Sequence, residues 1–318
     1  MMGELKDLLI IPHIKIHNAN ALSSPFTIGF PAMTAWLGAV HALQRKLNDR
    51  DIAVIFSATG VVSHDMELQT YKGDNDFVHS IIGTGNPLDK TGERSAFIEE
   101  ARCHLDVSLV IQLDKSIELE DFDHLITNIE HLLHSSMKMA GGDIEEFKTP
   151  FYLNVKDGDS VDMARVKRAL MPGYALIERR ELMIDAMEKG MDALDALIDY
   201  LAIHHRCEID DEDNITWTSH RKTRNNEPVG WLVPVATGFH GISDLGEAKN
   251  QRDAETPHRF AESVVTLGEF KMLHRIQYVE DILWRYGTDG DLYLCQQKNQ
   301  SPQSSKLNPA DHTIESEF

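Results

Sequence analysis

Two separated stretches of the chain carry side chains that could hold a polyanion. In the second stretch, Arg252 and Arg259 supply planar guanidinium groups, which suit phosphates and base edges. Rings that could stack on bases and glycines that permit close backbone approach surround them: Gly238, Phe239, His240, Gly241, His258 and Phe260. This pattern predicts an RNA-binding segment. Each arginine also has acidic neighbours, so local ion pairs within a long ordered loop are the alternative.

The first stretch is a loop rich in amide and hydroxyl groups. It contains Asn18, Asn20, Ser23 and Ser24. We expect its backbone and amide groups to contact bases or phosphates. The alternative is an Asn-rich turn that caps the helix after it.

That helix is predicted from Pro31 onward, because proline suits a first helical turn. Opposite its apolar face runs a stripe of Thr34, Gly38, His41 and Arg45. A glycine inside a helix costs roughly 1 kcal/mol relative to alanine, so Gly38 suggests that something packs closely there, either another helix or strand or a ligand. His41 and Arg45 could reach phosphate or duplex DNA, or could form a solvent-facing helix end.

Catalytic motifs are missing from the sequence, which contains no phosphate-binding Walker loop, nucleophile elbow or His-Glu-x-x-His pair. The best catalytic alternative is a metal-independent ribonuclease with His240 or His258 as the base. The run from His204 to Glu208 lacks the paired spacing of a zinc site. We therefore predict no catalytic residue, no metal and no cofactor.

Charge and composition limit the possible partners and location. The net charge of −20 rules out a non-specific polycation, but the acid is concentrated in residues 99–146 and 185–213, so RNA binding is not excluded. The acidic segments are expected to face away from RNA or to meet basic subunits. Three distant cysteines, no signal-peptide pattern and no apolar run of about 18 residues predict a cytoplasmic protein that binds no membrane.

The expected order of elements is β-α-β-insert-β-α-β, which is an α+β, ferredoxin-like arrangement. Strands are predicted at residues 5–17, 51–64, 102–113 and 151–155, helices at 31–47 and 119–139, and an inserted hairpin lobe at about 65–101. A second region should contain helices at 161–171 and 181–206 and strands at 215–219 and 230–239. The predicted domains are 1–156 and 157–295, followed by a disordered polar tail at 296–318.

The motifs of both stretches resemble one known family. The resemblance rests on Asn18-x-Asn20-Ala-x-Ser23-Ser24-Pro25, Gly29-Phe30-Pro31-Ala-x-Thr34-Ala-x-Leu-Gly38-x-x-His41-Ala-Leu-x-Arg45, Gly230-Trp-Leu-Val-Pro234-x-x-x-Gly238-Phe-x-Gly241-Ile-Ser243, Arg252-Asp253-x-x-Thr256-Pro257-x-Arg259-Phe260-x-Glu262-Ser263 and Asn86-Pro87-Leu-x-Lys90-x-Gly92. These resemble the second subunit of the Csy family, the Cas-five-type proteins of type I-F CRISPR surveillance complexes (Cascade-like). The similarity runs from about residue 5 to about residue 295.

The resemblance implies a ferredoxin-like, RRM-like (RAMP-type) fold and a non-catalytic role. Proteins of that kind bind the 5′ handle of the CRISPR RNA and pair with the large subunit. They lie beside the repeated backbone subunits, where the protospacer-adjacent end (PAM) of the target double-stranded DNA enters. Two alternatives remain open. Some Cas-five-type proteins of other subtypes cleave precursor CRISPR RNA, and a purely structural adaptor would bridge protein subunits without touching RNA.

Overall fold

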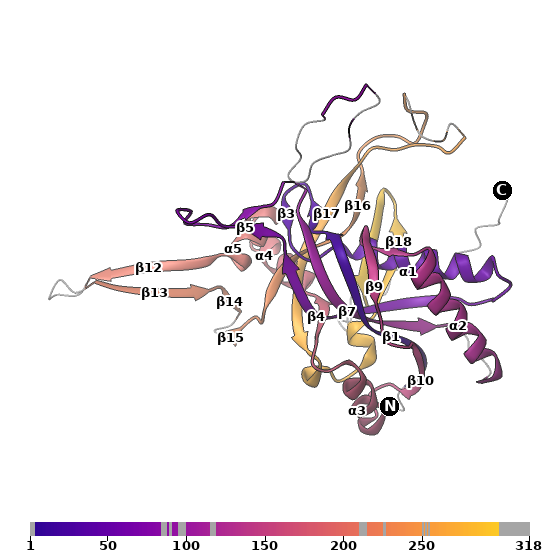
Figure 1. The fold of residues 1–318 in the computed structure, drawn as a ribbon. Coiled ribbons are helices and arrows are strands. Elements are labelled where there is room, and N and C mark those ends of the chain that lie inside the picture. The colour runs from indigo at the N-terminus through magenta and orange to yellow at the C-terminus, as the bar shows by residue number, and fades with distance from the viewer. Residues whose placement is uncertain are drawn as a thin grey trace.

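A computed structural model describes residues 4–83, 88, 91–94, 100–114, 119–209, 215–224, 227–249, 251, 253 and 255–298. Eleven strands of this described part form one large antiparallel sheet (Figure 1). Its strands are β1 (Leu5–Asn20), β4 (Phe56–Leu68), β7 (Arg102–Leu113), β8 (Lys138–Met139), β9 (Gly142–Glu146), β10 (Phe151–Lys156), β11 (Tyr174–Glu178), β16 (Leu232–Gly241), β17 (Ala261–Met272), β18 (Trp284–Asp289) and β19 (Leu292–Gln297).

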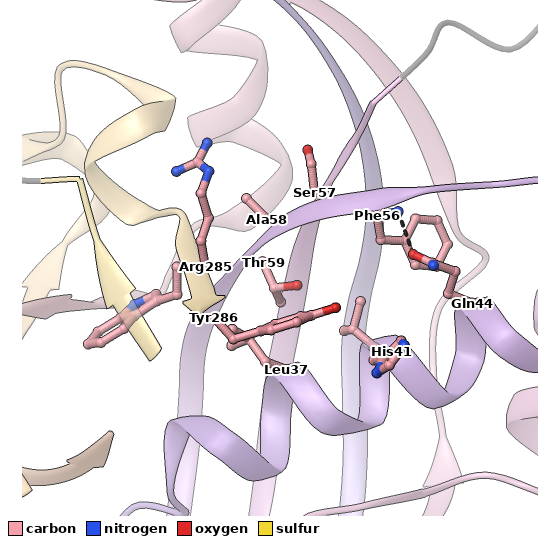
Figure 2. Close-up of a pocket in the computed structure, with 11 residues that line it drawn as sticks. Leu37, His41, Gln44, Phe56, Ser57, Ala58, Thr59, Arg285 and Tyr286 are labelled. Atoms are coloured by element: carbon pink, nitrogen blue, oxygen red, sulfur yellow. Dashed lines mark hydrogen bonds between the residues drawn. The ribbon is translucent and has the colours of Figure 1, made fainter. Parts of the chain in front are cut away.

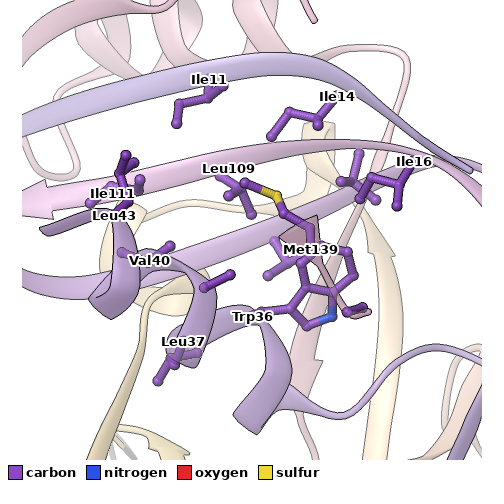
Figure 3. Close-up of a cluster of buried hydrophobic side chains, with 14 of the residues drawn as sticks. Ile11, Ile14, Ile16, Trp36, Leu37, Val40, Leu43, Leu109, Ile111 and Met139 are labelled. Carbon is purple, nitrogen blue, oxygen red and sulfur yellow. The ribbon is translucent and has the colours of Figure 1, made fainter. Parts of the chain in front are cut away.

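Four long strands of the N-terminal half lie in the order β10-β1-β7-β4. Helices α1 (Met33–Asn48) and α2 (Leu119–Ser135) join them and share one face of the sheet. The apolar stripe of α1, which includes Trp36 and Leu43, packs on side chains of β1 and β7 (Figure 3). The stripe recurs at three- and four-residue steps, as burial against a sheet requires.

The other face of these strands carries a second core under helix α3 (Ser160–Leu170). Leu8, Ile10 and Val110 belong to this core, whereas Leu9, Ile11 and Leu109 belong to the first. Both sides of the sheet are therefore buried here, which explains why β1 and β7 read as nearly continuous apolar runs.

The C-terminal half adds to the same sheet instead of forming another. The order continues β4-β18-β19-β16-β17-β11, and β11 also pairs with β4, so these six strands close a ring of pairings. The short helices η1 (Leu273–Arg275) and η2 (Val279–Ile282) connect β17 to β18. The boundary predicted at residue 156 therefore does not separate two sheets.

The predicted single helix at 181–206 is wrong. The chain forms α4 (Arg180–Glu188) and α5 (Ala193–Leu201), separated by a turn in which Gly190 has φ +94°. Residues from Ile203 onward belong to β12 (Ile203–Ile209), which pairs only with β13 (Ile215–Arg221). The predicted strand at 215–219 thus lies in a ribbon that projects from the body (Figure 1), not in the main sheet.

Several predicted boundaries also move. Strand β4 runs to Leu68, paired with β7, so any inserted lobe begins later than residue 65. Helix α2 ends at Ser135, and the β8–β9 hairpin follows it. The remaining short strands are β2 (Leu22–Ser24), β3 (Thr27–Ile28), β5 (Thr70–Tyr71), β6 (Ser80–Ile81), β14 (Thr223–Arg224) and β15 (Glu227–Pro228).

The C-terminal boundary differs too. Gln296 and Gln297 lie in β19, although the sequence places them in the tail; residues 299–318 lie outside the described part. No helix within the described residues is long and apolar enough to cross a membrane.

Candidate nucleic-acid interface

Asn18 adopts a left-handed conformation, with φ +61°, where the pairing of β1 with β7 shifts its register between Ile16 and Ala19. Its backbone N–H donates to Nδ1 of His104 at 3.3 Å, and its side-chain oxygen accepts from Nε2 of Gln69 at 3.0 Å. Asn18 thereby connects β1 to β7 and to the residue after β4. It remains exposed, so a ligand could reach it.

The loop after Asn18 uses most of its polar groups internally. The side chain of Asn20 donates to the carbonyl of Leu22 and accepts from its N–H, both at 3.1 Å. The Ser23 and Ser24 hydroxyls lie 3.0 and 2.6 Å from the Thr27 hydroxyl. A nucleic acid would therefore have to share or replace these bonds. None of them caps α1, whose N-cap residue is Ala32.

The exposed stripe of α1 is open. Nothing described lies within 4 Å of where a Cβ of Gly38 would be, so the predicted packing of another helix or strand on this glycine is wrong, and the ligand alternative stays a prediction. The helix also begins at Met33, two residues after Pro31. Gly38 therefore leaves a shallow notch on this face of the helix.

One turn further on, the ring of His41 lies 5.8 Å from that of Tyr286, beside a small hollow between α1, β4 and β18 (Figure 2). Partial burial and the nearby charge of Arg45 lower the pKa of His41. Arg45 itself is exposed and makes no ion pair with a residue in the described ranges. Its guanidinium is available to a phosphate.

The glycines of the second segment sit where neighbouring atoms leave no room for a side chain. A Cβ on Gly238 would overlap the carbonyl oxygen of Tyr293 in β19. A Cβ on Gly241 would lie 2.5 Å from Cδ of Arg259. The first glycine therefore serves strand pairing, and the second makes space for a guanidinium.

Arg259 is held in that space by the chain itself. Its Nε donates to the carbonyl of Ser243 at 2.7 Å, and its terminal nitrogen pairs with Asp291 at 2.8 Å. Its side chain is 30% exposed. A local ion pair and a partly accessible cation therefore coexist here. Arg252 lies outside the described residues.

Residues with rings precede and follow this arginine in the sequence, and others lie at the end of strand β16. Phe239 and Phe260 are exposed, and the ring of His258 meets that of Phe260 edge-on at 5.0 Å. Nδ1 of His240 lies 3.2 Å from a Glu262 oxygen. Exposed aromatic faces next to a cation are what single-stranded RNA binds by stacking.

Strand β16 links the predicted residues. Strands β2 and β3 of the first segment and helix α1 all contact β16, whose end carries the second segment. The fold thus places both segments and the α1 stripe on elements that share one neighbour. The predicted RNA contacts of individual residues stay predictions.

Sequence reasoning missed a group of polar residues on β1, β4 and β7. Nδ1 of His13 lies 3.1 Å from both carboxylate oxygens of Asp106, and its ring stacks on His64 at 4.1 Å. Nε2 of His64 lies 2.6 Å from the hydroxyl of Ser108. Partial burial is the main reason why the pKa of His64 is lowered. These residues are far apart in the sequence, so no local spacing could have revealed them.

Comparison with known proteins decides the family. The family model for the CRISPR-associated protein Cas_Csy2 matches residues 9–295. The chain belongs to the Csy2 family.

A member of the Csy2 family from Pseudomonas aeruginosa (strain UCBPP-PA14), described as CRISPR-associated protein Csy2, is 33% identical to this chain over 306 residues. The match covers 89% of this chain and 92% of that protein. The resemblance to the second subunit of the type I-F Csy family, predicted from the sequence motifs, is thereby confirmed. The match spans both predicted segments, since they lie within residues 9–295.

Proposed function

We propose that this chain is a non-catalytic RNA-binding subunit of a type I-F surveillance complex and holds the 5′ handle of the CRISPR RNA. Membership of the Csy2 family carries this proposal. The order β10-β1-β7-β4, with α1 and α2 on one face, supports a ferredoxin-like (RAMP-type) domain. Several RNA-binding modules use such a sheet.

The proposed contact surface is the end of the β16–β17 hairpin. It presents two exposed phenylalanines, two histidines and the guanidinium of Arg259 on a protein whose net charge is −20. The guanidinium of Arg259 creates a local positive charge on an otherwise acidic protein. Such a local charge favours an anionic partner at this surface. We propose that Arg252 also contacts the RNA.

The proposed protein partners are the large subunit and the backbone subunit of the complex. We further propose that the chain helps to position target double-stranded DNA near the PAM. The exposed α1 stripe is a candidate surface for the duplex, since Arg45 at its end is exposed and makes no ion pair with a residue that the structure describes. We propose no enzymatic activity for this subunit, and we place the complex in the cytoplasm.

The test compares Arg259→Ala with Asp291→Ala in the assembled complex, at fixed salt, by the affinity for handle RNA. If Arg259 contacts RNA in a bidentate way, Arg259→Ala weakens binding by roughly 1–3 kcal/mol. Asp291→Ala breaks the same ion pair but keeps the cation, so it should leave binding unchanged or improve it. Equal losses in both variants would mean that the ion pair merely holds the loop.

Arg252→Ala is expected to weaken binding by a similar amount. Unchanged affinity in both arginine variants refutes the assignment of this surface.

Handle RNA incubated with the protein, with and without chelator, should stay intact, and its cleavage would establish the ribonuclease alternative. Footprinting should show a protected 5′ end, whereas an accessible 5′ end would identify a structural adaptor.

A further inference from the structure

The histidine group on β1, β4 and β7 has the composition of a metal site. The two imidazoles of His13 and His64 and the carboxylate of Asp106 each offer one ligand atom, and these atoms lie within 4.8 Å of one another. All three residues are partly buried. Two histidines and one carboxylate suit a first-row transition ion such as Zn²⁺ and leave coordination positions open.

The surroundings of His64 fix its orientation. Its Nδ1 lies 2.5 Å from the carbonyl oxygen of Pro172, which can only accept a hydrogen bond, so Nδ1 carries the proton. Nε2 then holds the lone pair and accepts a hydrogen bond from the hydroxyl of Ser108 at 2.6 Å. A histidine that binds a metal commonly donates its other N–H to a carbonyl or carboxylate in this way.

The position of His13 is set by the backbone. A bulge between Ile11 and Ile14 interrupts the pairing of β1 with β7, and His13 adopts φ +49° within it. Its N–H donates to the Ser108 hydroxyl at 3.0 Å. Bulges re-aim side chains, and a left-handed histidine persists only where its surroundings hold it. Here both features direct the imidazole onto His64 and Asp106.

The distances allow closure around an ion. Ligand atoms that bind Zn²⁺ at roughly 2.0–2.2 Å stand about 3–3.5 Å apart in a tetrahedral site. Nδ1 of His13 and the oxygens of Asp106 already lie 3.1 Å apart. The lone pair of His64 would turn from the Ser108 hydroxyl, which keeps the His13 N–H as its partner. The ligand atom of His64 lies within 4.8 Å of the other two, so side-chain rotations on three neighbouring strands would bring the three ligands together around the ion.

We propose that His13, His64 and Asp106 bind a first-row transition-metal ion, with Zn²⁺ as the expected occupant and Co²⁺ as a spectroscopic substitute. The ion would connect the bulge of β1 to β4 and β7, which are adjacent strands of the same sheet. Its effect would be structural, because it would fix three strands without using the predicted RNA-binding residues. The proposal is thus independent of the proposed function.

The test uses the full chain, freed of metal and titrated with Co²⁺ while visible absorption is recorded. We expect one bound ion per chain and displacement by Zn²⁺. Zn²⁺ should also raise the melting temperature, because an ion that binds only the folded state stabilises it. His13→Gln, His64→Gln and Asp106→Asn should each weaken binding at least tenfold, since loss of a mere outer-shell partner typically costs roughly 10–100-fold.

The matched controls are His17→Gln and His104→Gln. These two histidines also form a cross-strand ring pair, at 4.5 Å, but do not belong to the three-residue group. Their substitution should leave the metal affinity within about twofold of the wild type. This change is well below the loss of at least about tenfold expected for a ligand. Melting of each variant without metal shows whether it folds.

Two results would overturn the proposal. One is a wild-type chain whose absorption and melting temperature do not respond to Co²⁺ or Zn²⁺, which requires no variant. The other is a Co²⁺ band that survives all three ligand substitutions, which would place the ion at other histidines.

Discussion

At the residue scale, Gly238 and Gly241 belong to one motif, but each is a glycine for a different structural reason. Gly238 lets the backbone of β19 approach, whereas Gly241 faces the side chain of Arg259. The sequence predicts close approach at both positions without distinguishing backbone from side chain. The distinction matters because a side chain can move aside and a paired strand cannot.

We therefore expect Gly238→Ala to destabilise the protein by about 1–3 kcal/mol, the usual cost of overpacking. Gly241→Ala should cost less than about 1 kcal/mol, because it displaces a partly exposed ion pair of small value. Urea denaturation of both variants measures the difference in the free energy of unfolding. Equal losses would show that Arg259 cannot move.

Glu178 is the residue whose titration should affect stability. Burial raises its pKa to about 7 from 4.5, despite the nearby Arg180 and the hydrogen bond from Gln297. The folded protein thus binds this proton more tightly than the unfolded chain. The resulting stabilisation is complete below pH 4.5 and is lost as the pH rises through about 7.

Glu178→Gln should remove the loss of stability that the wild type shows as the pH rises, because the glutamine side chain does not titrate. Relative to the wild type, the free energy of unfolding of the variant should rise between pH 5 and pH 8, by at most about 3 kcal/mol. Urea denaturation at several pH values measures it. Glu188→Gln, at an exposed carboxyl of α4, is the control and should change stability by less than about 0.5 kcal/mol. A pH-independent difference for Glu178→Gln would contradict the prediction.

At the element scale, α1 was predictable because one local period determines it. Its apolar stripe is buried as expected. By contrast, β11 and β17 were not predicted: a buried carboxylate, Glu269, interrupts the apolar pattern of β17, and β11 has only five residues, the last of which is the buried Glu178. Glu269 of β17 pairs with Arg179, a contact between residues 90 positions apart. Such a partner is invisible to a window that reads neighbouring residues.

The region after residue 180 shows the opposite error. Its apolar residues keep a helical period across the break at Gly190, so a pattern of core residues predicts one helix where the chain makes two. The acidic residues of these helices also find partners within the chain: Asp185 pairs with Arg224, and Asp199 with Lys222. Part of the acidic surplus is therefore neutralised locally.

Gly38 tests whether the exposed face of α1 is a contact surface. Because nothing described lies within 4 Å of its Cβ position, Gly38→Ala should stabilise the isolated chain by up to about 1 kcal/mol. Urea denaturation checks this gain. If a partner subunit or nucleic acid packs on the glycine, the same variant should assemble less well, as co-purification would show. A lower free energy of unfolding for Gly38→Ala in the isolated chain would contradict the conclusion that space is open at this glycine.

At the scale of the whole molecule, the ring of six strands brings together segments that are distant in the sequence. The candidate site depends on this: the residue types of both segments were readable, but their shared contact with β16 was not. The same holds for His13 and Asp106, which lie 93 positions apart. Sequence therefore predicts which residues have useful chemistry, and long-range strand pairing decides which of them meet.

The end of β19 gives the last test of this long-range pairing. Between β19 and β11, where both residues are buried, the N–H of Gln297 donates to Glu178 at 3.0 Å, and the N–H of Glu178 donates to the Gln297 side chain at 2.8 Å. Removal of Gln297 would leave the backbone N–H and the carboxylate of Glu178 without these hydrogen-bond partners. A buried polar group that loses its partner costs about 1–3 kcal/mol.

A chain that ends at Lys298 should accordingly match the full chain in its free energy of unfolding within about 0.5 kcal/mol, because the polar composition beyond it predicts no packed contacts. A chain that ends at Cys295 should lose at least about 2 kcal/mol, since it loses both hydrogen bonds and two residues of strand pairing. Gln297→Ala in the full chain separates the side-chain bond from the pairing and should fall between the two. Equal stability of the two truncated chains in urea would mean that β19 contributes nothing beyond Cys295, and the folded body would then end where the sequence alone places it.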